Sequence, residues 1–379
     1  MDFFNLESSS EEEPAEQISQ PEAVKSKWDW DQPENFGLYF SFKPHHSKRK
    51  LSGDNCSAPR KKDDRAKIEK LSEHSFNLSG HKSSVNKITW SKKTLHHLLS
   101  CSFDSNVILW NLKDLSVKKF DMHTKLVRSI SFSLYETSFF TASFDQTSCL
   151  TDLETSQILS KYCHADILTS VCAHPKDEHL ALLGSKNEIL LWDTRTSKIS
   201  KKYKAKSYLG LIQDILFLDD TQFVSSGDVL SRDSAEYSIL VWDFDSTAIL
   251  SNQIFHEKYV CTHLRKHPFS NLFYGQTHGN YIAEFSSRSP FKMNKKKKFK
   301  STGHVTEGYS IGFDLNSSGC LIASGSTKGS VCIYNSNSGG LIKKIEYPHK
   351  EAIKPMSLDV SFKKRLDEEV LAVSYSNVN

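Results

Sequence analysis

The sequence lacks the long apolar run that a membrane helix needs. No stretch approaches the roughly 20 apolar residues of such a helix, and the N-terminus, MDFFNLESSSEEEP, is acidic where a secretory signal would be basic and then apolar. The eight cysteines include no C-x-x-C pair, and several lie inside apolar strand-like runs. We therefore expect a soluble, intracellular protein with no membrane partner and with reduced core cysteines.

The sequence also lacks the common catalytic and cofactor motifs. It contains no H-E-x-x-H, no dinucleotide fingerprint and no strained G-x-S-x-G elbow. In GSTKGS, residues 325–330, the lysine precedes the glycine, unlike in a phosphate loop, and HPKDEH, residues 174–179, suits a polar turn. We therefore expect no enzyme activity, no cofactor and no metal. The formal net charge of +4 is modest for 379 residues and does not by itself indicate a nucleic-acid partner.

Charge is distributed unevenly along the N-terminal part. Residues 1–30 carry eight carboxylates against two lysines, and residues 41–70 carry ten Lys or Arg against four acids. This pattern predicts a disordered tail over residues 1–73. Within it, two basic clusters have the spacing of a bipartite nuclear-import signal, although a solvated basic linker is the alternative. These nuclear-import candidates are Lys48, Arg49, Lys50, Arg60, Lys61 and Lys62.

A repeat begins at about residue 76. Strand-like runs end at Trp110, Thr151, Trp192, Trp242, Phe285 and Tyr334, at intervals of 41, 41, 50, 43 and 49 residues. This is the period of a four-stranded propeller blade. A histidine lies 28 to 30 residues before the strand end in five of the six units, at His81, His123, His164, His256 and His304. A seventh unit opens at His349.

The repeat resembles the WD-repeat family of β-propellers. The resemblance implies an all-β, seven-bladed propeller, which we place at residues 74–379. It also implies a buried structural network of histidine, hydroxyl, carboxylate and strand-end tryptophan, here His81, Ser100, Asp104 and Trp110. Ser, His and Asp together also suit a hydrolase triad, but no elbow or oxyanion site accompanies them. The third unit has Leu182 and Lys186 in the hydroxyl and carboxylate places.

The seventh unit stops early. KPMSLDVSF and VLAVSYS read as its first two strands, and the sequence ends at Asn379 where other units continue into a third strand. As in WD-repeat propellers, HSFNLS at residues 74–79 is expected to form the outermost strand of this blade. We therefore predict an incomplete last blade with unpaired edges, and a transcript that continues into a Trp-ended strand.

Several strings between residues 231 and 313, such as QTHGNYIAEFS, resemble more specifically a WD-repeat subfamily that includes a second-step splicing factor. The resemblance implies a nuclear ribonucleoprotein setting. We expect a non-enzymatic scaffold, monomeric within a larger complex, with spliceosomal proteins as partners. A lysine run flanked by Phe291 and Phe299 either contacts RNA phosphates or protects an edge strand; its members are Lys295, Lys296, Lys297 and Lys298.

Two further features are candidates for partner binding. WDTR, residues 192–195, resembles the W-D-x-R motif with which some propellers dock on the cullin-4 ligase adaptor. Arg195 would then be the docking residue, and the alternative function is a substrate receptor of a cullin-4 RING ubiquitin ligase. The alternative interpretation is a solvent-exposed turn arginine. A long insertion, residues 225–238, offers Arg232 and Asp233, because long rim loops often carry specificity.

Overall fold

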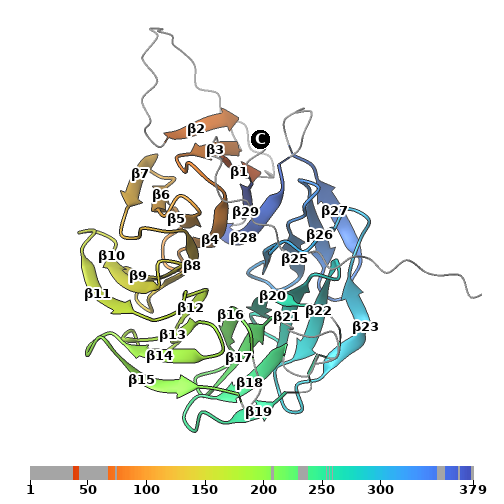
Figure 1. Ribbon diagram of the computed structural model, residues 1–379. Coiled ribbons are helices and arrows are strands. Elements are labelled where there is room, and N and C mark those ends of the chain that lie inside the picture. The colour runs from red at the N-terminus through yellow and green to blue at the C-terminus, as the bar shows by residue number, and fades with distance from the viewer. Residues whose placement is uncertain are drawn as a thin grey trace, which may run out of the picture. The chain divides into compact units, whose positions relative to one another are not determined.

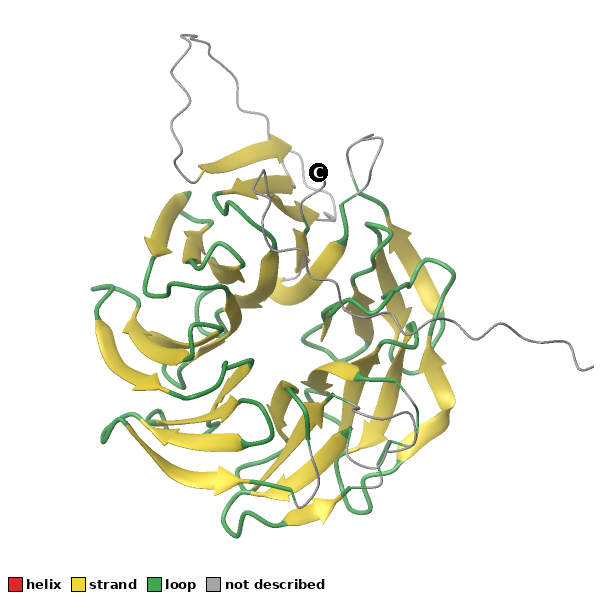
Figure 2. Ribbon diagram, in the orientation of Figure 1, coloured by secondary structure: helices red, strands yellow, loops and turns green. Residues whose placement is uncertain are grey.

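The computed structural model describes residues 37–41, 67–72, 75–205, 209–228, 238–252, 254–255, 257, 259–347, 355–365 and 368–376. The chain divides into residues 1–31 and 32–379, and all described residues belong to the second unit. Every element in these ranges is a β-strand (Figure 2), and none of the described residues forms a helix able to span a membrane. Arg232, Asp233 and the nuclear-import candidates lie outside the described residues.

Three four-stranded antiparallel sheets form the first half of the repeat. Blade one consists of β4 (Val85–Trp90), β5 (His97–Ser102), β6 (Val107–Asn111) and β7 (Ser116–Phe120). Blade two consists of β8 (Val127–Phe132), β9 (Ser138–Ser143), β10 (Thr147–Asp152) and β11 (Ile158–Cys163). Blade three consists of β12 (Ser170–Ala173), β13 (Leu180–Gly184), β14 (Ile189–Asp193) and β15 (Lys198–Tyr203).

Three more sheets of the same kind follow. Blade four consists of β16 (Ile212–Phe217), β17 (Gln222–Gly227), β18 (Ile239–Asp243) and β19 (Ile249–Ser251). Blade five consists of β20 (Cys261–Lys266), β21 (Leu272–Thr277), β22 (Tyr281–Ser286) and β23 (Met293–Phe299). Blade six consists of β24 (Phe313–Leu315), β25 (Leu321–Ser324), β26 (Val331–Asn335) and β27 (Leu341–Ile345).

The seventh sheet is built from both ends of the described chain. Its strand order is β2 (Lys67–Ser72), β3 (Ser75–Ser79), β1 (Gly37–Ser41), β29 (Glu368–Tyr375) and β28 (Ser357–Arg365). The C-terminal part supplies two strands, as predicted. The expected unpaired edge between them and β3 is wrong, because β1 pairs antiparallel with both β29 and β3. A strand can pair with any strand beside it in space, whether or not the two are close in sequence. The upstream strand β1 therefore fills the third position of this sheet.

The seven sheets close into a ring around one axis (Figure 1). Their first strands contact one another in the order β4, β8, β12, β16, β20, β24, β28 and again β4. The third strands of blades one, three and four are buried on both faces, because each lies between two neighbouring sheets. Trp110, Trp192 and Trp242 at their ends are wholly buried. The predicted all-β, seven-bladed propeller is confirmed.

Candidate interaction surfaces and the buried network

The four residues of the predicted network lie together in blade one. His81 Nε2 is 2.7 Å from Ser100 Oγ, and Ser100 Oγ is 2.8 Å from Trp110 Nε1. His81 Nδ1 is 3.1 Å from Asp104 Oδ2. The indole N–H can only donate, so the Ser100 hydroxyl accepts from Trp110 and donates to His81. His81 therefore carries its proton on Nδ1 and donates it to Asp104.

The carboxylate of Asp104 joins the turn to this network. Burial by itself would raise the pKa of Asp104, but hydrogen bonds from His81 and from the backbone N–H groups of Lys82 and Asn106 lower it to about 2. Ser100 is wholly enclosed and bonded on both sides. A hydroxyl without access to solvent cannot meet a substrate, so the arrangement supports a structural role over a hydrolase triad.

Two other blades keep the histidine part of the network. In blade two, His123 contacts Thr141 Oγ1 at 2.7 Å and Asp145 Oδ2 at 2.9 Å. In blade six, His304 lies 3.1 Å from Ser324 Oγ and 3.1 Å from the hydroxyl of Tyr334. Burial lowers the pKa of His304 to about 4. The imidazole in blade six is therefore neutral near pH 7 and makes only neutral hydrogen bonds to these two groups.

Blade three departs from the expected alignment by one residue. The β13–β14 register places Leu183, not Leu182, in the position that Ser100 occupies in blade one, and the carboxylate position shifts with it. A shift of one residue in a strand exchanges its two faces. With leucine in the hydroxyl position, the indole N–H of Trp192 has no hydrogen-bond partner among the described residues. Blade three therefore relies on apolar packing at this point.

The first strands line a pocket of about 820 Å³ on the propeller axis. It is formed by the later half of each first strand and by the turns toward the second strands. A β-bulge interrupts the pairing of five first strands. Such a bulge re-aims the neighbouring side chains, and the residue that resumes the pairing after each bulge is polar or charged: Lys87, Ser129, Asp214, His263 and Asp359.

Charged side chains around this pocket connect neighbouring blades. Lys87 Nζ donates to a blade-two hydroxyl at 3.0 Å. The carboxylates of Asp214, Asp314 and Asp359 accept backbone N–H groups of blades five, seven and one at 3.0, 2.8 and 2.9 Å. Burial raises the pKa of Asp359 to about 6 and also raises that of Asp314, although the positive charge of Arg265 opposes both shifts. These bonds hold the inner strands in register with one another.

Arg128 reaches from blade two to the far side of the axis. Its Nη2 donates to Ser310 Oγ at 2.7 Å, and Ser310 lies 3.0 Å from His263 Nε2. The sequence analysis missed this charged inner ring. The signal that could have revealed it is a charged residue inside a short apolar strand, as in QDILF and LDVSF.

Comparison with known proteins agrees with this geometry. The family model "WD domain, G-beta repeat" matches residues 72–111, the segment that contains all four residues of the blade-one network. Seven sheets of the propeller type close around the axis. The chain has the fold of a WD-repeat β-propeller. The resemblance stated from the sequence is therefore confirmed.

Three relatives of this WD-repeat propeller are informative. WD repeat-containing protein 25 of Mus musculus is 39% identical over 267 residues, which cover 69% of this chain and 49% of that protein. Pre-mRNA-processing factor 17 of Homo sapiens is 28% identical over 281 residues, covering 73% and 47%. DDB1- and CUL4-associated factor 5 of Homo sapiens is 24% identical over 147 residues, covering 37% and 16%. The chain spans about half the length of the first two.

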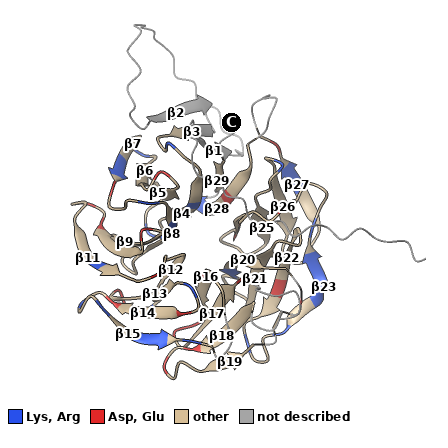
Figure 3. Ribbon diagram, in the orientation of Figure 1, with Lys and Arg blue, Asp and Glu red and all other residues tan. Residues whose placement is uncertain are grey.

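The lysine run lies on β23, the outermost strand of blade five. Basic residues also lie on the outer strands β7, β15 and β27, as on β23 (blue in Figure 3). Lys297 Nζ lies 2.5 Å from Glu284, and Lys298 Nζ lies 2.7 Å from Glu257. The ammonium groups of these two lysines are therefore paired within the protein, and this agrees with lysines that protect an edge strand from pairing with another chain.

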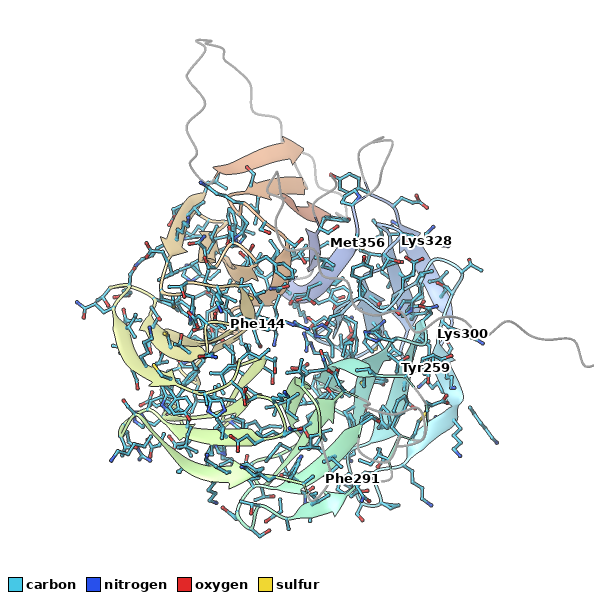
Figure 4. The ribbon with its side chains drawn as sticks, in the orientation of Figure 1. Phe144, Tyr259, Phe291, Lys300, Lys328 and Met356 are labelled. Atoms are coloured by element: carbon cyan, nitrogen blue, oxygen red, sulfur yellow. The ribbon has the colours of Figure 1, made fainter. Side chains whose placement is uncertain are left out.

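The other side chains of this segment divide by exposure. Lys295 and Lys296 are exposed, and no carboxylate among the described residues pairs with either of them, so they remain available to a partner. Phe291 and Phe299 are buried in the core, and Figure 4 shows Phe291 and Lys300 at opposite ends of the strand. The flanking phenylalanines therefore offer no stacking platform to a nucleic acid.

Arg195 lies in the turn between β14 and β15. Its Nε and Nη2 donate to the carboxylate of Asp193 at 3.0 and 2.8 Å, and its side chain is 55% exposed. The hydrogen bond and charge of Asp193 raise the pKa of Arg195 further, so it is always charged. The pair presents a flat, oriented guanidinium to solvent.

Proposed function

We propose that this WD-repeat propeller is a non-enzymatic protein-interaction scaffold in a nuclear ribonucleoprotein assembly, and that its protein partners belong to the splicing machinery. The similarity to Pre-mRNA-processing factor 17 over 73% of the chain carries this proposal. The structure supports a scaffold, because the Ser–His–Asp set is enclosed and the closed ring presents turns on both rims. Nuclear import through the basic clusters of residues 48–62 belongs to the same proposal.

The test is affinity purification of the tagged full chain from nuclear extract, with and without nuclease, read by mass spectrometry. A tagged, unrelated seven-bladed propeller is the matched control. We expect splicing proteins to remain with this chain after nuclease treatment and to be absent from the control. Recovery of splicing proteins only while RNA is intact, or equally with the control, would contradict the scaffold.

A second candidate function is substrate reception for a cullin-4 RING ubiquitin ligase. Two observations favour it: the exposed, oriented guanidinium of Arg195 and the similarity to DDB1- and CUL4-associated factor 5. Arg288 occupies the same place relative to its strand end in blade five and is also exposed. Binding of purified DDB1 should be lost in Arg195→Ala and kept in Arg288→Ala if this function is correct. Unchanged binding in both variants, or no binding by the wild type, argues against it.

A further inference from the structure

The mouth of the pocket on the propeller axis carries exposed apolar side chains. On the rim formed by the turns between first and second strands, Leu95 is 38% exposed, Tyr135 is 54% exposed and Phe269 is 79% exposed. Leu95 lines the pocket, Tyr135 stands between the lining residues Leu134 and Glu136, and Phe269 lies in the turn after β20 on the same rim. The wall behind them includes Phe132, Leu134, Leu216, Phe217, Leu315 and Phe362. Exposed aromatic and aliphatic groups around a concave site are typical of a binding surface.

The charge of this mouth is positive. Its lining holds three carboxylates, Glu136, Asp214 and Asp314, against six cations, Lys87, Lys92, Arg265, Lys266, Lys363 and Lys364. The carboxylates are already used: Asp214 and Asp314 accept N–H groups of neighbouring blades, and Glu136 accepts two backbone N–H groups of the blade-one turn at 2.6 and 3.0 Å. The six cations outnumber the three carboxylates, so the lining of the pocket has a net positive charge.

Two of the cations remain available at the rim. Lys92 and Lys364 are exposed, and within the described part of the chain neither ammonium group has a hydrogen-bond or ion-pair partner. They come from blades one and seven, whose first strands are neighbours. Lys363 donates to the backbone carbonyls of Ser91 and Lys92, which ties the two turns together. Lys92 and Lys364 therefore lie on neighbouring blades and form a cationic edge of the pocket.

This arrangement suits an acidic peptide better than RNA. A nucleic acid needs cations in a row along its phosphates and free aromatic platforms for its bases. Here the free cations lie on one side of the mouth, the carboxylates of Asp214 and Asp314 lie within the pocket, and the ring of Tyr135 already faces the ammonium of Lys93 at 4.8 Å. A peptide can place carboxylates against the cationic edge and one apolar side chain in the pocket.

We propose that this mouth binds an acidic segment of a partner protein that carries an aromatic or large aliphatic anchor. The inference rests on the proposed scaffold function, and it names the surface and the chemistry of the partner. The carboxylates of that segment pair with Lys92 and Lys364, and its anchor fills the space between Leu95 and the wall of the pocket.

The probe is a phage-displayed library of short random peptides, selected on the purified full chain. The strongest binder is then synthesised with a fluorescent label and titrated by anisotropy. We expect selected peptides to be rich in Asp and Glu with one recurring apolar residue. Lys92→Glu with Lys364→Glu should weaken binding about tenfold or more, because two ion pairs become repulsions. The matched control reverses two exposed lysines on the outer strands, Lys161→Glu with Lys343→Glu, and should bind normally.

A second variant tests the apolar part independently of charge. Leu95→Ala shortens an exposed side chain that lines the pocket and borders the anchor space, so it should fold normally and still weaken the labelled peptide several-fold. Selection of neutral or basic peptides, or equal weakening in the outer-strand control, would overturn the proposal. It would also be overturned if labelled oligouridine, but no peptide, bound at Lys92 and Lys364.

The two proposals fail separately. Splicing proteins recovered from extract, with no acidic peptide selected on the purified chain, would overturn the docking site and leave the scaffold in place. Acidic peptides bound at the mouth, with no splicing protein recovered from extract, would support the docking site and overturn the proposed assembly.

Discussion

Substitution of Ser100 by alanine tests the buried network most directly. The hydroxyl is wholly buried and is the hydrogen-bond partner of both Trp110 Nε1 and His81 Nε2. Alanine therefore leaves one buried donor and one buried acceptor unpaired. Each such group costs about 1–3 kcal/mol, so we expect Ser100→Ala to lower the free energy of unfolding by about 2–6 kcal/mol.

Blade four supplies a matched control for this magnitude. Ser225 Oγ accepts from Trp242 Nε1 at 2.8 Å, and no histidine contact to this hydroxyl is present among the described residues. Ser225→Ala should therefore strand one buried group and cost about 1–3 kcal/mol, roughly half the effect of Ser100→Ala. Burial, strand position and the chemical change are the same in both variants, so the difference isolates the histidine contact.

The assay is urea unfolding at neutral pH, followed by far-ultraviolet circular dichroism and by tryptophan fluorescence. Coincidence of the two signals establishes that a single free energy of unfolding is meaningful. An effect of Ser100→Ala equal to or smaller than that of Ser225→Ala would refute the network. If the wild type hydrolysed an ester and Ser100→Ala abolished that activity without loss of stability, the hydrolase alternative would replace it.

Three other predictions concern the ring and its edges. Asp359 has a raised pKa of about 6 against an ordinary 3.8, so the folded protein binds this proton more tightly. Relative to Asp359→Asn, wild-type stability should therefore fall by up to about 3 kcal/mol as pH rises from about 4 to 6; parallel unfolding free energies across that range would disprove it. Lys297→Ala, which leaves the buried carboxylate of Glu284 without its cation, should lower the melting temperature more than Lys295→Ala, and equal shifts would argue against the ion pair. Replacing residues 37–41 by a Gly-Ser linker should lower the melting temperature and speed hydrogen exchange in β29, whereas unchanged exchange would mean that β1 does not complete the sheet.

The repeat was readable from the sequence because it is local. Each blade carries its own alternating strands and its own strand-end residue, and the period survives although the network residues do not. Trp110, Trp192 and Trp242 end buried third strands as predicted. The blade-one network was expected from the resemblance to WD-repeat propellers, and its members meet because His81 and Trp110 belong to the same repeat unit.

The errors arose where pairing depends on partners distant in sequence. Whether Leu182 or Leu183 takes the hydroxyl position depends on the β13–β14 register, which a single strand does not contain. The missing third strand of blade seven is supplied by residues 37–41, because any segment with free backbone groups and sufficient reach can pair there. Composition had placed those residues in a tail.

The sequence by itself determined the fold class, the number of blades and the residues that end the third strands, since these follow from a short-range pattern repeated along the chain. Only the tertiary structure decided which charged residues face one another. Arg128 meets Ser310 across the axis, and Lys92 lies beside the seventh blade through a contact of first strands far apart in sequence. These side chains meet only because the ring closes, and a pattern that repeats within single blades contains no information about contacts between distant blades.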